Sequence, residues 1–149
     1  MAKERGARPI RLAALAGGLA ALTLGCSLEP PTSLPAGAQA IEAPAIFQTW
    51  WARTEACSGL TGNYAGIQWY VVPGANTFQT DSGDKVGFWI KSRVGTRIIL
   101  AGDYRDYELV VRHEMLHELL GREGHPPEYF QTRCHLTWDS FQQSAMARR

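Results

Sequence analysis

Residues 110–130 read VVRHEMLHELLGREGHPPEYF and contain three of the four histidines of this 149-residue chain. Apolar residues recur at helical spacing as far as residue 120, and the following Gly121 is of the type that commonly ends a helix. Asp103 is a suitable N-cap, so the pattern predicts a helix from about residue 103 to residue 120. Residues four apart on a helix lie side by side, one turn from each other. His113 and His117 are therefore expected to point from one face.

The five residues from His113 to His117 have the spacing His-Glu-x-x-His, in which two neutral imidazoles bind a zinc ion and the glutamate acts as a base. Together with Val110 and Val111 before it, this motif resembles the active-site helix of the zincin metallopeptidases. The resemblance covers this helix and the strand that precedes it, and it implies a Zn²⁺-dependent peptidase with Glu114 as general base. One departure is Glu118, because the zincin pattern prefers an uncharged residue there. A helix with two incidental histidines is the alternative.

A catalytic zinc site needs a third protein ligand. In the metzincins this ligand is a histidine six residues after the second one, with a glycine between. Here His125 lies eight residues after His117, with Gly121 and Gly124 between, and we expect it to be the third ligand. Its alternative role is to cap the short helix expected over residues 126–134. The other candidate ligands are Glu123, Glu128, His135 and Asp139.

The zincin resemblance also implies how a substrate is held. It assigns the border of the cleft to the strand before the active-site helix, residues 97–101. It further suggests a phenol or imidazole that stabilises the oxyanion of the tetrahedral intermediate. We assign that role to Tyr129, with His135 as the alternative.

The rest of the chain predicts a small sheet covered by helices. Residues 45–57 have an apolar helical pattern with two tryptophans, which we expect in the core, and residues 67–73, 85–91 and 97–101 have the composition of strands. The order helix, three strands, helix predicts the α+β class, with about three strands packed by an N-terminal helix and the histidine helix. Residues 45–149 are thus expected to form one zincin-like domain.

The first 25 residues predict export. A basic segment is followed by the apolar run LAALAGGLAALTL, which is typical of a secretory signal and short for a transmembrane anchor. The run ends at Gly25-Cys26, which resembles a bacterial lipoprotein site where Cys26 receives lipid. Residues 26–44 are rich in proline and small residues and would form a tether to the membrane of the cell envelope. Cleavage at Ala38-Gln39-Ala40, giving a soluble secreted protein, is the alternative.

Two further cysteines, Cys57 and Cys134, remain in the exported part and are expected to form a disulfide, with two separate buried thiols as the alternative. Residues 1–25 hold four of the 15 basic and one of the 14 acidic residues, so the mature net charge is about −2. No block of basic residues suggests nucleic-acid binding. We expect a monomer.

These observations favour a zinc peptidase that hydrolyses peptide bonds in peptide or protein substrates outside the cytosol. The main alternative is an inactive zincin-like lipoprotein that binds zinc or a partner. A structural lipoprotein without metal is a third hypothesis.

Overall fold

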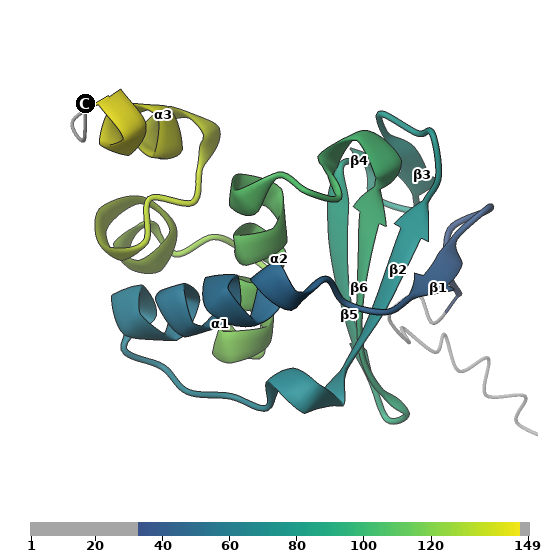
Figure 1. Ribbon diagram of the computed structural model, residues 1–149, viewed down its shortest axis with the longest axis horizontal. Helices are drawn as coiled ribbons and strands as arrows, with labels where there is room; N and C mark the ends of the chain where they lie inside the picture. Colours follow the sequence, from purple (N-terminus) through teal and green to yellow (C-terminus); the bar gives the residue numbers. More distant parts are fainter. Residues whose placement is uncertain (1–32, 147–149) are drawn as a thin grey trace, which may run out of the picture.

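The computed structural model describes residues 33–146 (Figure 1). The expected signal peptide (1–25), the lipidation site at Cys26 and the first part of the tether (26–32) lie outside the described residues. Within residues 33–146, no helix has both the length and the apolar character needed to cross a membrane.

The α+β class is confirmed, because helices pack on a four-stranded sheet. The strand order is β1-β2-β6-β5, in which β2 and β6 are parallel neighbours and β1 and β5 are antiparallel edge strands. A separate hairpin is formed by β3 and β4. The strands are β1 (Gln39–Ile41), β2 (Ile67–Val72), β3 (Phe78–Thr80), β4 (Gly83–Lys85), β5 (Gly87–Ser92) and β6 (Gly95–Ala101).

The three predicted strands correspond to β2, β5 and β6. The short strands β1, β3 and β4 were not predicted, and β1 lies in residues that we expected in the tether. Leu34 and Ala38, also from the expected tether, pack with Ile99 on the face of the sheet opposite the helices. The part of the chain that belongs to the domain therefore begins before residue 45.

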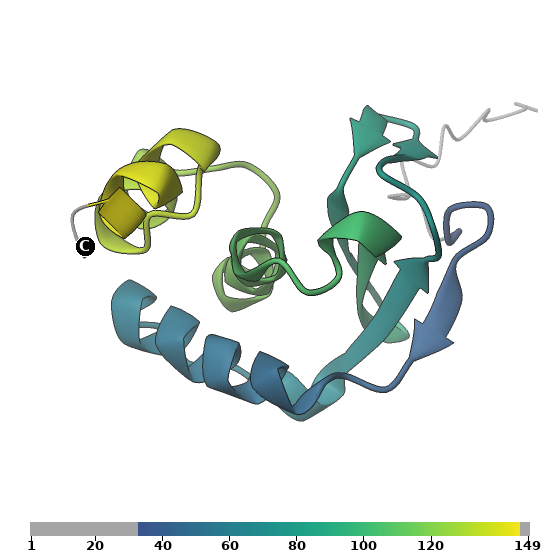
Figure 2. The same cartoon turned by 45° about the horizontal axis from the view of Figure 1, so that its top comes forward.

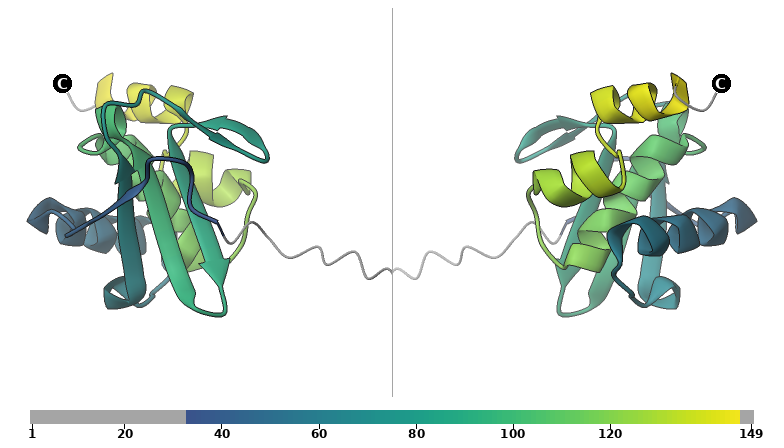
Figure 3. Two further views of the ribbon diagram at one scale, coloured as in Figure 1. Left: turned by 90° about the vertical axis from the view of Figure 1, so that its right-hand side faces the viewer. Right: turned by 90° about the vertical axis from the view of Figure 1, so that its left-hand side faces the viewer.

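All the longer helices lie on one face of the sheet, as the two opposite views in Figure 3 show. Helix α2 runs between the sheet and the C-terminal segment, and α1 packs beside it (Figure 2). The helices are α1 (Ala45–Ser58), α2 (Glu108–Leu120), the π-helix η3 (Glu128–Arg133) and α3 (Trp138–Met146), with short 3₁₀ turns η1 (Tyr64–Gly66) and η2 (Gly102–Tyr104). The short helix predicted at 126–134 is present as η3, and α3 was not predicted.

Helix α2 begins later than the sequence predicted. Asp103 lies in η2 rather than at a helix N-cap, and the N-cap residue of α2 is Tyr107. The first turn of α2 instead begins with Glu108, whose carboxylate pairs with Arg112 one turn later at 2.9 Å. The predicted end is correct, because Gly121 follows the helix with φ 62° in the left-handed region.

Aromatic side chains fill the core between α1, α2 and the sheet. Phe47 is fully buried, and the adjacent Trp50 and Trp51 of α1 are buried as expected. A second apolar cluster joins α2 to the C-terminal segment and contains Leu109, Leu116, Phe130, Cys134 and Leu136. The predicted disulfide between Cys57 and Cys134 is confirmed, and it ties α1 to the residue that follows η3.

Two charged residues fix α2 against its neighbours. Arg112 is buried toward α1, where its Nε donates to the hydroxyl of Thr54 at 3.1 Å, in addition to its pair with Glu108. Glu118 lies on the sheet side and accepts hydrogen bonds from the indole of Trp89 at 2.8 Å and the hydroxyl of Thr96 at 2.9 Å. These contacts set the rotation of the helix about its axis, which decides where its histidines point.

Candidate metal centre

The two imidazoles of α2 are oriented by backbone carbonyl groups. Nδ1 of His113 lies 2.8 Å from the carbonyl oxygen of Leu136, and Nδ1 of His117 lies 3.1 Å from that of Arg122. A carbonyl oxygen only accepts, so both Nδ1 atoms carry the hydrogen and both Nε2 atoms keep a free lone pair. Histidines that bind metals in proteins are commonly held in this way.

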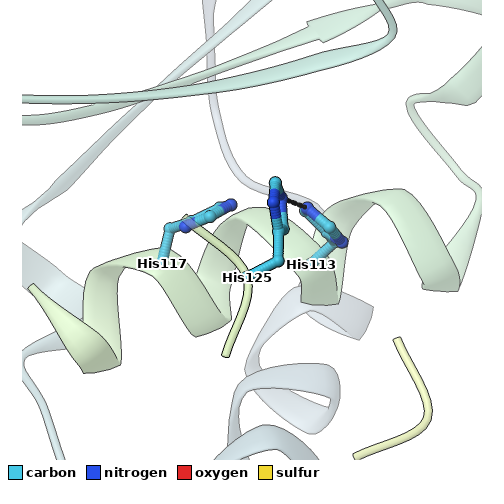
Figure 4. A group of neighbouring side chains, drawn as sticks. All are labelled: His113, His117 and His125. Carbon is cyan, nitrogen blue, oxygen red and sulfur yellow. Dashed lines mark hydrogen bonds between the residues drawn. The ribbon is translucent and has the colours of Figure 1, made fainter. Parts of the chain in front are cut away.

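The third histidine comes from the loop after α2. Positive φ angles at Gly121 (62°) and Gly124 (89°) turn the chain back, and His125 then lies between the two helix histidines (Figure 4). Its Nε2 is 2.9 Å from Nε2 of His113, and the ligand atoms of the three histidines all lie within 4.8 Å of one another. Two nitrogens bound to one tetrahedral zinc are about 3.3 Å apart, which falls inside this range. The three histidines can therefore hold a metal ion.

The other candidate ligands do not join this group. Glu128 pairs with Arg133 at 2.6 Å, and His135 is exposed. Glu123 lines a cavity next to the three histidines, but its carboxylate does not belong to the cluster of ligand atoms. Among residues 33–146, the group of possible metal ligands that meets here consists of the three histidines.

Burial keeps these imidazoles neutral. It lowers the pKa of His113 and of His117 to about 4, and it also lowers the pKa of His125, with a smaller contribution from the charge of Lys85. The fully buried ring of Phe130, from η3, lies 4.8–5.0 Å from each of the three imidazole rings, centroid to centroid. A neutral imidazole is the form that binds a metal ion, so the cluster is ready to bind at neutral pH.

Glu114 lies beside the cluster rather than in it. Its side chain is buried against β5, and burial raises its pKa to about 8, while the charge of Lys85 and the backbone N–H of Trp89 act in the opposite direction. The backbone of Gly87 approaches so closely that a Cβ there would lie 2.7 Å from Oε1 of Glu114. A carboxylate in this position can exchange a proton with a molecule bound next to the histidines.

Two cavities flank the histidines. One has a volume of about 510 Å³ and the other about 320 Å³, and His113, Glu114 and His125 line both of them, together with Lys85 and Gly87. The larger cavity has an apolar wall made of Val86, Leu109, Val110, Leu136 and Trp138. The candidate metal position therefore lies in an open cleft, with one cavity on each side of it.

The cleft border predicted from the resemblance is wrong. Strand β6, which contains residues 97–101, pairs with β2 on one side and β5 on the other, so its backbone cannot bind a further chain. The cleft is bordered by the edge strand β5 and the residues just before it, with Lys85, Gly87 and Phe88 in its lining. The strand before the helix, β6, is therefore an inner strand of the sheet, whereas the resemblance implied that it borders the cleft.

Tyr129 and His135 do not line either cavity. Tyr129 packs beside the C-terminal apolar cluster, and the guanidinium of Arg133 lies 5.2 Å from its ring centroid. The structure thus brings His113, Glu114, His117 and His125 together and leaves the expected oxyanion-stabilising side chain in a packing role.

Sequence reasoning missed Lys85, Gly87 and the carbonyl of Leu136. Each reaches the site through contacts with residues far away in the chain, and no local motif marks any of them. The only signal was the strand composition of residues 85–91, which predicted the strand but not its place at the edge of the sheet.

Comparison of the chain with protein-family models, with curated protein sequences and with solved structures finds no match.

Proposed function

We propose that this protein is a zinc-dependent peptidase that cleaves peptide bonds in an extended substrate lying across the histidine cleft. The observation that carries the proposal is the pair of helix imidazoles, each oriented by a backbone carbonyl, that meets His125 beside a buried carboxylate in an open cleft. No other arrangement on the described part of the chain combines possible metal ligands with a candidate base.

Zinc is the metal that suits this ligand set. Three neutral imidazoles without a bound carboxylate favour zinc among the common divalent ions, and catalytic zinc sites hold three protein ligands with one position open. A zinc ion held by His113, His117 and His125 supplies a Lewis acid that polarises a carbonyl group and lowers the pKa of water.

Glu114 acts as the general base. Its carboxylate takes a proton from the attacking water molecule and later gives that proton to the leaving nitrogen. Both steps require a carboxyl group next to the bound substrate, and Glu114 lines both cavities beside the three histidines.

The edge of β5 offers backbone groups to an extended substrate. Ala101 donates its N–H to the carbonyl of Val86, so Val86 faces β6 and the backbone groups of the next residue, Gly87, face away from the sheet. An extended peptide can add to such an edge through main-chain hydrogen bonds. The apolar wall of the larger cavity then accommodates a large apolar side chain of the substrate.

A place outside the cytosol belongs to this proposal. The Cys57–Cys134 disulfide supports it, because such bonds persist mainly in oxidising compartments. The lipid anchor at Cys26 remains part of the hypothesis for the exported chain.

The experiment compares hydrolysis of a fluorescein-labelled unfolded protein by the purified zinc-loaded wild type and by Glu114→Gln. We expect zinc content to be equal and hydrolysis by the variant to fall by about 10²-fold or more. Equal zinc with no hydrolysis by either protein would favour the alternative of an inactive zinc-binding or partner-binding lipoprotein. Zinc binding that is lost in Glu114→Gln would contradict the role of Glu114 as a base.

A further inference from the structure

Lys85 lies where the two cavities meet. It is the last residue of β4, is half-buried, and lines both cavities together with His113, Glu114 and His125. Among residues 33–146, it is the one lysine or arginine that lines either of these cavities. Its place is thus next to the position that a scissile bond would occupy.

The ammonium group of Lys85 has no fixed partner in the protein. Across the described residues it makes no hydrogen bond and no ion pair within 4.0 Å, whereas Lys91 on the adjacent strand pairs with Glu118 at 3.3 Å. The charge of Lys85 is nevertheless felt by both Glu114 and His125. A half-buried cation without a protein partner is available to an anionic ligand in the cleft.

We propose that Lys85 binds the oxyanion of the tetrahedral intermediate, the role that the sequence had assigned to Tyr129. This inference rests on the proposed peptidase function. The water oxygen forms a bond to the carbonyl carbon, the π electrons of the carbonyl move onto its oxygen, and the proton of the water passes to Glu114. Lys85 donates a hydrogen bond to that oxygen. When the carbonyl forms again, the carbon–nitrogen bond breaks and the proton on Glu114 goes to the leaving nitrogen, while Lys85 keeps its own protons.

The arrangement of the cavities favours an oxyanion over the terminal carboxylate of a substrate. A residue that anchors a chain terminus is expected where a cleft ends, but the cleft continues on both sides of Lys85. The substrate chain therefore passes this residue, and the charge that forms beside it is the one that develops during the reaction. Removal of a single oxyanion donor commonly lowers kcat by about 10²–10³-fold.

The test uses a phosphinic pseudo-peptide, whose tetrahedral anionic group imitates the oxyanion, with apolar residues on both sides. Its affinity for the zinc-loaded protein is measured by calorimetry, together with the affinity of the uncharged peptide of the same sequence. The variants are Lys85→Met, Lys85→Arg and, as a matched control, Lys91→Met, which removes the same charge from β5 outside both cavities.

We expect Lys85→Met to keep its zinc and its affinity for the uncharged peptide but to bind the phosphinate at least 10-fold more weakly. Its kcat should fall by about 10²-fold with little change in KM, Lys85→Arg should recover part of the loss, and Lys91→Met should behave as wild type. Wild-type phosphinate affinity in Lys85→Met would overturn the assignment. A wild type that binds zinc but neither ligand would instead overturn the peptidase function, and the role of Lys85 with it.

Discussion

Replacing Gly87 by alanine places a methyl group directly against the candidate base. The new Cβ would lie 2.7 Å from Oε1 and 2.9 Å from Cγ of Glu114, and 2.9 Å from Cγ1 of Val110. Because ordinary contacts of this kind are about 3.5–4.0 Å, the Glu114 side chain or the helix has to move by about 0.5–1 Å. Both neighbouring residues are largely buried, so their movement disturbs the packing of α2 against β5.

The movement has two measurable results. Overpacking of a buried contact lowers the free energy of unfolding by about 1–3 kcal/mol. Displacement of a base by a fraction of an ångström to 1 Å lowers the rate of hydrolysis by up to about 10²-fold. Zinc content should remain at the wild-type value, because the three atoms nearest to the new methyl group belong to Glu114 and Val110 and not to the histidines.

The assays are urea unfolding, zinc content and hydrolysis of a labelled unfolded protein. Gly66→Ala is the matched control, since its Cβ would meet only the flexible amide of Asn63, at 3.1 Å, on the exposed turn η1. The control should change unfolding by less than about 0.5 kcal/mol. Wild-type stability and activity in Gly87→Ala would refute the close packing of Glu114 against β5 and the role derived from it.

Three further predictions concern the base, the disulfide and the apolar cavity. In the metal-free protein the pKa of Glu114 is raised from 4.5 to about 8, so the stability associated with its protonated form is present below pH 4.5 and is lost as pH rises toward 8. At pH 8 the free energy of unfolding of Glu114→Gln, measured in urea, should therefore exceed that of wild type by roughly 2–4 kcal/mol, and the difference should vanish near pH 4.5. A difference that stays constant with pH would contradict the burial of this carboxyl group. Replacing Cys57 and Cys134 by alanine should lower the free energy of unfolding by about 4 kcal/mol and weaken zinc binding by about 10-fold, because the nearby Leu136 carbonyl no longer holds His113 in place. Competition with a chelator would measure the zinc affinity, and an unchanged affinity would show that the disulfide does not help to position the histidines. Trp138→Ala, at the wall of the larger cavity, should lower kcat/KM about 10-fold for peptides with a large apolar residue and leave peptides with alanine there unchanged; equal losses for both would argue against a side-chain pocket.

The sequence predicted those parts of the site that depend on local spacing. His113 and His117 share a face because helical geometry places residues four apart side by side, and the helix exists because its apolar residues pack against the sheet and the C-terminal segment. His125 could be proposed because two glycines between it and the helix allow the chain to turn back. Each of these inferences uses residues less than 15 positions apart.

The parts that were wrong depend on contacts between distant segments. The composition of residues 97–101 predicts a strand, but only pairing with β2 and β5 places it inside the sheet and leaves β5 at the edge. The helix start was misplaced because Asp103 is a good N-cap in isolation, while the chain after β6 first forms the turn η2. Tyr129 was assigned by analogy, and the turn of η3 directs it toward the C-terminal cluster.

Measurement of zinc content tests the central claim most directly. The protein is purified without a metal-binding tag, and bound zinc is determined by elemental analysis for wild type, His125→Ala and His135→Ala. His135 is the matched control, because it is an exposed histidine from the same segment that lies outside the cluster. The three-histidine site predicts about one zinc per chain in wild type and in His135→Ala and a large loss in His125→Ala. No zinc in wild type after zinc is supplied, or full zinc in His125→Ala, would contradict the site.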